Sequence, residues 1–143
     1  YGFEVLPTDV TLVYILWETL KGQDIWRLMP QIAEFDNGNL VYNYDFTQTD
    51  VRFFLDGSID FTLLDDTYTQ NQVFRVVVVP ADNVGRFDYS NLDIVMLQYN
   101  IESFPKRWAY FVLKTATKNK SFGYITEAVI LYPQLRNKMY IYA

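Results

Sequence analysis

The sequence predicts a mostly β protein, an antiparallel β-sandwich that contains one short helix. Half of the 143 residues are hydrophobic, with 12 Tyr, 11 Phe and 3 Trp, which is enough material for one buried core. About nine strand-like stretches follow one another at the short spacing that is typical of sandwiches and barrels. We therefore expect a single domain over residues 1–143 with Ig-like architecture. A closed barrel of lipocalin type is the alternative, because it too is built from consecutive hairpins.

The first two predicted strands cover residues 2–6 and 10–18. The segment "VTLVYILW", from Val10 to Trp17, is the longest apolar candidate in the chain. It is far shorter than the roughly 20 residues that a membrane-spanning helix needs. We therefore predict a buried strand here, and no membrane span anywhere in the chain.

A hairpin is predicted over residues 32–46. In "LVYNYDF", residues 40–46, apolar and polar residues alternate as in a half-buried strand. This stretch follows "IAEF", residues 32–35, and the dipeptide Asn37-Gly38 lies between the two. Asn-Gly is typical of a type I′ turn, in which both central residues have positive φ. We therefore place Asp36 in a turn.

A second hairpin is predicted over residues 51–64, with Asp56-Gly57 in its turn. Its strands are "VRFFL", residues 51–55, and "IDFTLL", residues 59–64. Alternation predicts six side chains that point inward: Val51, Phe53, Leu55, Ile59, Phe61 and Leu63.

Four further strands complete the predicted sheets. "VFRVVVV", residues 73–79, is β-branched and ends before a proline, which favours a strand buried on both faces. The last three strands are expected over 107–114, 124–132 and 138–143. The connection that follows the first of these is polar and basic, and we expect an exposed tip there, with Lys114, Lys118 and Lys120 in or beside it.

One segment has the period of a helix and not of a strand. In "SNLDIVMLQYN" the apolar residues fall at helical spacing, which predicts a helix over 91–99. Ser90 and Asp93 have the spacing of a capping box, and Asn100 is a suitable C-terminal stop. A strand through "DIVML" is the competing interpretation.

The segment "FRVVVVPADNVGRFDYSNLDIVMLQYNI", residues 74–101, resembles exported β-sandwich domains of Bacteroidetes-type cell-envelope proteins. In these domains a strand that ends in Val-Pro leads through a short loop to Asp-Tyr and a small helix that ends in Tyr-Asn-Ile. The resemblance covers a fifth of the chain, and it implies location and fold more than activity. The matching residues are Val79, Pro80, Asp88, Tyr89, Tyr99, Asn100 and Ile101.

The composition excludes several kinds of chemistry. The chain has no His and no Cys, which removes Ser-His-Asp and Cys-His catalysis, thiol chemistry and the commonest zinc ligands. It has no glycine-rich phosphate loop, and we predict no cofactor. The net charge of −5 argues against a nucleic-acid partner. Charge is uneven: residues 1–66 hold 12 acidic and 3 basic residues, and residues 67–143 hold 5 and 9.

The acidic residues offer two alternatives to a purely structural role. Three pairs are candidates for an acid and a base in a hydrolase: Asp65 with Asp66, Asp56 with Asp60, and Asp45 with Asp50. A loose calcium site joining Asp36, Asp56 and Asp65 would require their turns to meet. Because Asp is common in turns for conformational reasons alone, we interpret most of these residues as turn residues and predict no metal and no catalytic group.

Aromatic residues supply the candidate ligand-binding positions. Trp17, Trp26 and Trp108 lie in strand-like apolar stretches, so we expect them in the core. Three aromatic residues in loops or at element ends are better placed to bind a ligand, since flat rings bind sugars and fill protein interfaces. These are Tyr68, Phe87 and Tyr89.

These observations favour a non-catalytic structural or interaction domain of an exported or cell-envelope protein, with a protein or glycan partner. The first alternative is a glycan-binding module that uses exposed aromatic rings, and the second is a carboxylate-based hydrolase. The chain starts at Tyr1 and not at Met, as a mature periplasmic or cell-surface domain would, and as a fragment of a longer protein would. Because it contains no Cys, a lipid-anchored form would carry its lipidated Cys upstream of Tyr1.

Overall fold

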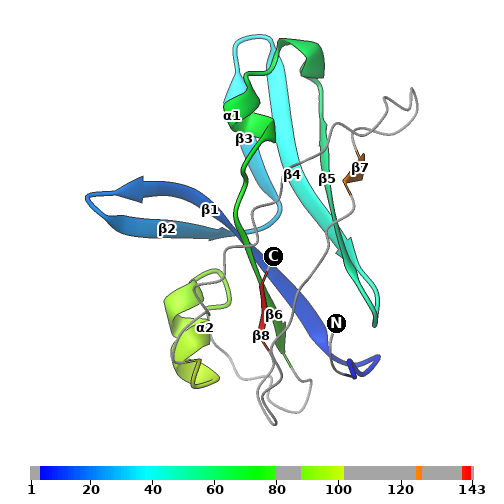
Figure 1. Ribbon diagram of the computed structural model, residues 1–143, viewed down its shortest axis with the longest axis vertical. Coiled ribbons are helices and arrows are strands. Elements are labelled where there is room, and N and C mark those ends of the chain that lie inside the picture. Colours follow the sequence, from blue (N-terminus) through cyan, green and yellow to red (C-terminus); the bar gives the residue numbers. More distant parts are fainter. Residues whose placement is uncertain (1–3, 80–87, 102–124, 127–139, 143) are drawn as a thin grey trace.

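The computed structural model of the protein describes residues 4–79, 88–101, 125–126 and 140–142 (Figure 1). These residues form a mostly β structure with two antiparallel sheets and a few short helices. The prediction of a mostly β, sandwich-like chain is confirmed. The described strands form two separate sheets and no closed barrel, so this part of the chain does not adopt the lipocalin-type barrel that was the alternative prediction.

The first sheet has the strand order β2-β1-β6-β8, and all its pairs are antiparallel. Its strands are β1 (Val10–Leu20), β2 (Gln23–Leu28), β6 (Phe74–Val79) and the short β8 (Tyr140–Tyr142). β1 is long because it serves two neighbours: its residues 10–15 pair with β6, and its residues 14–20 pair with β2. The distal parts of β1 and β2 form a hairpin that extends away from the rest of the molecule (Figure 1).

The second sheet has the order β3-β4-β5-β7 and is also antiparallel. Its strands are β3 (Gln31–Phe35), β4 (Gly38–Phe46), β5 (Val51–Gly57) and the two-residue β7 (Ile125–Thr126). The predicted hairpin over 32–46 is therefore confirmed as β3 and β4. Chain connections pass between the sheets, since β6 returns to the first sheet after β5.

The main core lies between the two sheets. The rings of Phe53 from β5 and Phe74 from β6 stack across it, with centroids 4.4 Å apart and planes 21° from parallel. Side chains of both sheets form one buried cluster, and burial of this apolar surface is the main force that holds the layers together. From the strands, the cluster contains Val13, Ile15, Leu40, Tyr42, Val51, Phe53, Leu55, Phe74, Val76 and Val78.

A second, smaller core lies on the other side of the first sheet, under helix α2 (Leu92–Gln98). Val77 and Val79 of β6 point into it, whereas Val76 and Val78 point into the main core. This is why the valine run of β6 is apolar at successive positions: both of its faces are covered, as predicted. Leu92 and Val95 of α2 are buried in this core, so the predicted helical face is confirmed.

The ends of α2 confirm one prediction and correct another. Asn91, and not Ser90, is the N-cap: its Oδ1 accepts hydrogen bonds from the backbone N–H groups of Asp93 and Ile94. Ser90 instead donates its hydroxyl to Asp88, so the predicted capping box does not form. At the other end Asn100 has φ of 50°, and Ile101 N–H bonds to Met96 O at 2.7 Å, which is a Schellman motif with Asn at C′.

The predicted hairpin over 51–64 is wrong in its second half. β5 pairs with β4 and β7, and residues 59–64 contain a 3-10 helix, η1 (Phe61–Leu63), in place of a strand. A four-residue helix, α1 (Asp66–Thr69), follows it. The reason is local: Asp60 Oδ1 accepts from Thr62 N–H at 2.9 Å, and such a bond competes with a strand ladder. Leu63, predicted to point inward, is 68% exposed.

The turns and the first strand also differ from expectation. Residues 4–6 form no strand, although Val5 is buried in the main core. The β3–β4 turn consists of Asp36 and Asn37, and positive φ occurs at Gly38 and not at Asn37, so the turn is not type I′. Strand β2 was not predicted. It is joined to β1 by Lys21 and Gly22, whose φ values of 52° and 80° are those of a type I′ turn.

Several predicted features lie outside the described residues. These are the strand over 107–114, Trp108 and the basic tip with Lys114, Lys118 and Lys120. Of the predicted strands over 124–132 and 138–143, residues 125–126 and 140–142 are described, and both segments are strands. No helix among the described residues is long and apolar enough to cross a membrane.

Candidate functional site

The loop that contains Tyr68 forms one end of the second sheet. We define the α1 end as residues 35–39, which hold the β3–β4 turn, together with residues 57–69, which hold η1 and α1 (Figure 1). The Tyr68 ring packs edge-on against Phe35, with centroids 5.0 Å apart. The hydroxyl of the buried Tyr42 donates to Tyr68 O at 2.9 Å. Tyr68 is thus held by the core through its backbone while its side chain is 37% exposed.

Close backbone contacts fix the turn and the loop of the α1 end against each other. Ser58 N–H donates to the side-chain oxygen of Asn39 at 3.0 Å, and Asn39 N–H donates to Ser58 Oγ at 3.1 Å. A Cβ atom at Gly38 would lie 2.8 Å from the backbone nitrogen of Ile59. The two segments approach each other so closely that the position requires glycine.

Two carboxylates of the α1 end serve as helix caps. Asp60 caps η1, and Asp65 caps α1 by accepting from Thr67 N–H at 2.8 Å. This bond to the charged form lowers the pKa of the Asp65 carboxyl below its ordinary value. The candidate acid–base pair of Asp65 and Asp66 therefore contains one carboxylate, Asp65, that caps a helix and whose lowered pKa favours its ionised form.

Asp56 and Asp60, the second candidate pair, also accept short local hydrogen bonds. Asp56 Oδ1 accepts from the backbone N–H of Gly57 at 2.7 Å, and Asp60 accepts from both the N–H and the hydroxyl of Thr62. The prediction that Asp56 and Gly57 form a hairpin turn is wrong: both residues belong to β5, where Asp56 pairs with Val41 and Gly57 with Leu40 of β4. Asp60 lies in the loop that follows, as the N-cap of η1. Both side chains lie on the exposed surface.

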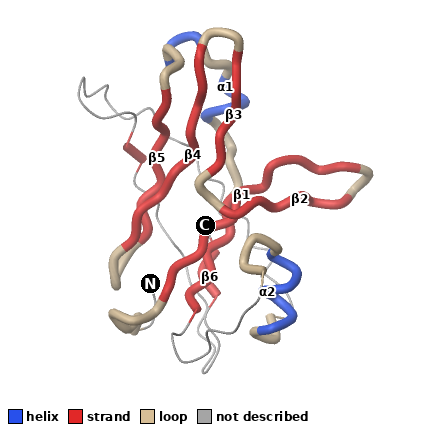
Figure 2. Tube along the Cα trace, turned by 180° about the vertical axis from the view of Figure 1, so that it is seen from behind, coloured by secondary structure: helices blue, strands red, loops and turns tan. Residues whose placement is uncertain are grey.

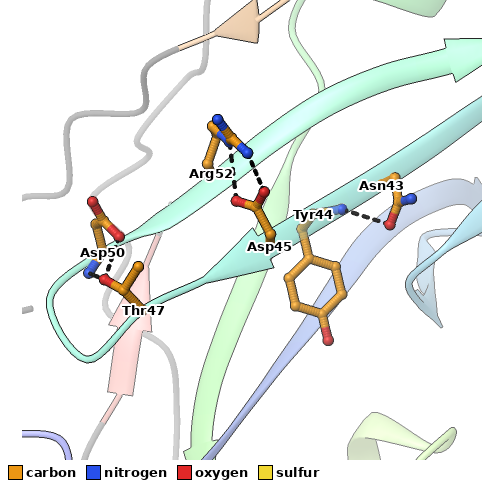
Figure 3. Close-up of polar contacts among 6 residues, drawn as sticks. All are labelled: Asn43, Tyr44, Asp45, Thr47, Asp50 and Arg52. Carbon is orange, nitrogen blue, oxygen red and sulfur yellow. Dashed lines mark hydrogen bonds and ion pairs between the residues drawn. The ribbon is translucent and has the colours of Figure 1, made fainter. Parts of the chain in front are cut away.

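The third pair, Asp45 and Asp50, lies in the β4–β5 hairpin (Figure 3). Asp45 in β4 forms a bidentate ion pair with Arg52 in β5. Asp50 accepts from the hydroxyl of Thr47 at 2.6 Å and closes the turn. The two carboxylates therefore have different partners, and both hold the hairpin in its register.

No group of three or more Asp or Glu side chains within the described ranges is placed to hold a metal ion. The candidate calcium ligands Asp36, Asp56 and Asp65 are thus not brought together as one such group. Asp36 lies exposed in the β3–β4 turn.

The other two candidate ligand-binding residues are not close to Tyr68. Tyr89 lies just before α2, and α1 and α2 are at different ends of the molecule (Figures 1 and 2). Tyr89 packs against the second core, and its backbone oxygen accepts from the hydroxyl of Tyr14 at 2.6 Å. Phe87 lies outside the described residues. Tyr68 and Tyr89 therefore do not form one site.

Two arginine–tryptophan contacts support the base of the β1–β2 hairpin. The guanidinium carbon of Arg27 lies 4.4 Å from the ring centroid of Trp17, and that of Arg75 lies 3.9 Å from that of Trp26. Both tryptophans are partly buried against a core cluster, Trp17 on the main core and Trp26 on the second. Such stacks order both partners. The sequence placed both tryptophans in the core but gave no signal for their arginine partners.

Comparison of the chain with protein-family models, with curated proteins and with solved structures finds no match.

Proposed function

We propose that the chain is a non-catalytic interaction domain of an exported or cell-envelope protein, with an Ig-like sandwich as its scaffold. One observation carries the interaction role: the β1–β2 hairpin projects from the sandwich and exposes its distal part (Figures 1 and 2). The location and the Ig-like assignment rest on the resemblance of residues 74–101 to exported sandwich domains.

The distal hairpin has the properties of a contact element. Every residue from Glu18 to Asp24 is exposed, and Leu20 is 55% exposed beside the turn. The Arg27–Trp17 and Arg75–Trp26 stacks hold the base of this hairpin, so its tip is presented on a supported ribbon. A projecting hairpin of this kind places an apolar side chain at a distance from the body, where a partner can bury it.

A photo-crosslinking residue at Leu20 tests this proposal in the cells that make the natural protein. We expect crosslinking to one defined species, and we expect it to disappear when the neighbouring turn is changed by Lys21→Glu and Gln23→Glu. The same probe at Leu97 of α2, which is 80% exposed, is the matched control. The proposal is wrong if position 20 gives no crosslink or gives the same products as position 97.

A glycan-binding module is the second candidate, favoured by the exposed aromatic residues. Phe46 is 43% exposed, and its ring lies nearly parallel to that of Tyr44, with centroids 6.2 Å apart. Tyr68 is at the other end of the second sheet, so it does not extend this pair into a line. Glycan-array binding that is lost in Phe46→Ala would support this function over the first.

A further inference from the structure

We propose that Asn37 is a site of spontaneous covalent modification, at which the side-chain amide is lost and the main chain passes through an isoaspartyl residue. The modification releases the hydrogen bonds that hold residues 57–69 against the β3–β4 turn. This goes beyond the proposed function, which concerns the β1–β2 hairpin and assigns no covalent change to the chain.

The reaction needs only the chain and water. The backbone nitrogen of Gly38 loses its proton and attacks Cγ of Asn37, so a bond forms between these two atoms and the bond from Cγ to the amide nitrogen breaks. The amide nitrogen takes up a proton and leaves as ammonia, and the product is a cyclic imide. Water then opens the ring at either carbonyl carbon, which gives an aspartyl or an isoaspartyl residue. Nothing is oxidised or reduced.

Two dipeptides of the chain have a glycine directly after Asn or Asp, and these are Asn37-Gly38 and Asp56-Gly57. Glycine favours ring closure, because it has no side chain to hinder its nitrogen and its backbone adopts many conformations. Asn37 lies in the two-residue β3–β4 turn, and its side chain is exposed. The structure therefore leaves the Asn37 amide accessible to the reaction.

Asp56-Gly57 lies in a strand and is restrained. Gly57 pairs with Leu40 of β4, and a Cβ atom at Gly57 would lie 2.2 Å from the carbonyl oxygen of Asn39, so the backbone has no room to move. The Asp56 carboxylate accepts from the Gly57 N–H at 2.7 Å, and its negative charge disfavours attack by a nucleophile. Of the two dipeptides, we therefore assign the reaction to Asn37-Gly38.

The fold slows the reaction at Asn37 without preventing it. Gly38 pairs with Phe35 across the turn, so ring closure requires the end of this hairpin to open. Such local openings cost less free energy than global unfolding. We therefore expect Asn37 to react more slowly in the folded chain than in a synthetic peptide of residues 34–42, and faster than any other Asn of the described chain.

The isoaspartyl product disturbs the α1 end because it adds a carbon atom to the main chain directly before Gly38. There is no space for this change: a Cβ atom at Gly38 would lie 2.8 Å from the backbone nitrogen of Ile59. The N–H groups of Ser58 and Ile59 both donate to Asn39 O, at 3.1 and 3.2 Å. A shift of residues 38 and 39 breaks these two bonds and frees the loop that carries Tyr68.

Incubation of the full chain at mildly alkaline pH tests the site, because the Gly38 nitrogen must lose a proton. Peptide mapping by mass spectrometry follows the conversion of amide to acid, and an isoaspartyl methyltransferase labels the rerouted product. We expect both products at Asn37, a rate that rises with pH, and no reaction in Asn37→Gln. Asn39 and Asn43 are internal controls, because bulky residues follow them. An unmodified Asn37 under conditions in which the synthetic peptide reacts would overturn the proposal.

Hydrogen exchange of the isolated isoaspartyl form tests the structural consequence. We expect the Ser58 and Ile59 amides to exchange about tenfold faster than in the wild type, and the Val95 amide, which bonds to Asn91 O in α2, to be unchanged. Asn37→Asp is the matched control, because it adds the same charge without lengthening the main chain. Unchanged exchange at Ser58 and Ile59, or equal acceleration in Asn37→Asp, would overturn the proposal. The crosslinking test at Leu20 depends on neither result.

Discussion

Glycine is required at single positions where two backbones touch. At Gly57 φ is +134°, and a Cβ atom would lie 2.2 Å from the carbonyl oxygen of Asn39. At Gly22 φ is +80°, but a Cβ atom would meet nothing within 4 Å. Substitution at Gly22 therefore measures the cost of placing a side chain at positive φ, and substitution at Gly57 measures that cost together with a steric clash against the backbone of Asn39.

We expect Gly57→Ala to lower the free energy of unfolding by about 3 kcal/mol, because it adds a backbone clash to an unfavourable φ. Gly22→Ala should cost only about 1 kcal/mol, since it introduces the unfavourable φ alone. Urea unfolding of both variants gives the comparison. Equal losses would show that the close approach of residues 39 and 57 does not occur.

Asp36 has a different role at the residue scale, because its side chain lies exposed in a turn. Asn is favoured in the same turns, so Asp36→Asn should change the free energy of unfolding by less than about 0.5 kcal/mol. Thermal melts of wild type and variant, each with calcium and with chelator, provide the measurement. A calcium-dependent rise in melting temperature that is lost in Asp36→Asn would instead identify this carboxylate as a metal ligand.

Buried tyrosine hydroxyls make folding sensitive to alkaline pH. Burial raises the pKa of Tyr42 to about 12, and burial also raises the pKa values of Tyr14 and Tyr44. In the unfolded chain tyrosine ionises near pH 10. The folded state therefore favours the protonated phenols, and this contribution is complete below pH 10 and is lost as the pH rises toward 12.

We expect the melting temperature to fall steeply between pH 10 and pH 12, and to fall less steeply in Tyr42→Phe. The variant loses the bond to Tyr68 O, so its stability at neutral pH should drop by about 1 kcal/mol. It also loses one of the groups whose ionisation opposes folding. An unchanged slope in Tyr42→Phe would mean that Tyr42 is not protected from ionisation in the folded state.

At the scale of elements, the N-terminal cap of helix α2 differs between the sequence-based prediction and the structure, and mutation can distinguish the two. The pattern predicts that Ser90 caps the helix, whereas the structure places the cap at Asn91. We expect Asn91→Ala to cost about 1 kcal/mol and Ser90→Ala to cost clearly less. Urea unfolding measures both. A larger loss of stability in Ser90→Ala than in Asn91→Ala would instead support the predicted capping box of Ser90 and Asp93.

Elements were predictable where the side-chain pattern and the backbone hydrogen bonds agree. The alternation of 40–46 predicts β4 because one of its faces is buried throughout most of its length. Residues 59–64 have the same alternation, but the Asp60 side chain accepts a hydrogen bond from Thr62 N–H, which favours the 3-10 helix η1 over a strand. β2 was missed because its residues are exposed or half-buried, which leaves little pattern to detect.

The candidate site was only partly predictable, because its residues lie where the side-chain pattern does not determine the backbone structure. Tyr68 could be proposed because an aromatic residue in a polar loop stands out in the sequence. Leu63 could not, since the alternation assigned it to the core and only the helical turn of η1 exposes it. The grouping of Asp36 with residues 60–66 depends on β3–β4 turn contacts with the loop after β5, which no local pattern encodes.

At the scale of the whole molecule, the first sheet is the central layer between two cores. β6 contributes Phe74 to the main core and Val77 to the core under α2. The second sheet is joined to the first by side-chain packing, of which the stacked Phe53 and Phe74 rings are one contact. If the layers unfold in one cooperative transition, every contact contributes to the same free energy of unfolding, and only residues in direct contact are expected to be non-additive.

A double-mutant cycle of Phe53→Leu and Phe74→Leu tests this arrangement. Stacked aromatic pairs add about 1 kcal/mol beyond the burial of their area, so we expect the two losses to be non-additive by about that amount. The control cycle combines Phe53→Leu with Val95→Ala, which lies in the other core, and should be additive to within about 0.5 kcal/mol. Coupling in both cycles would indicate a diffuse rearrangement. An absence of coupling between Phe53 and Phe74, measured by urea unfolding, would mean that the two sheets do not pack through these rings.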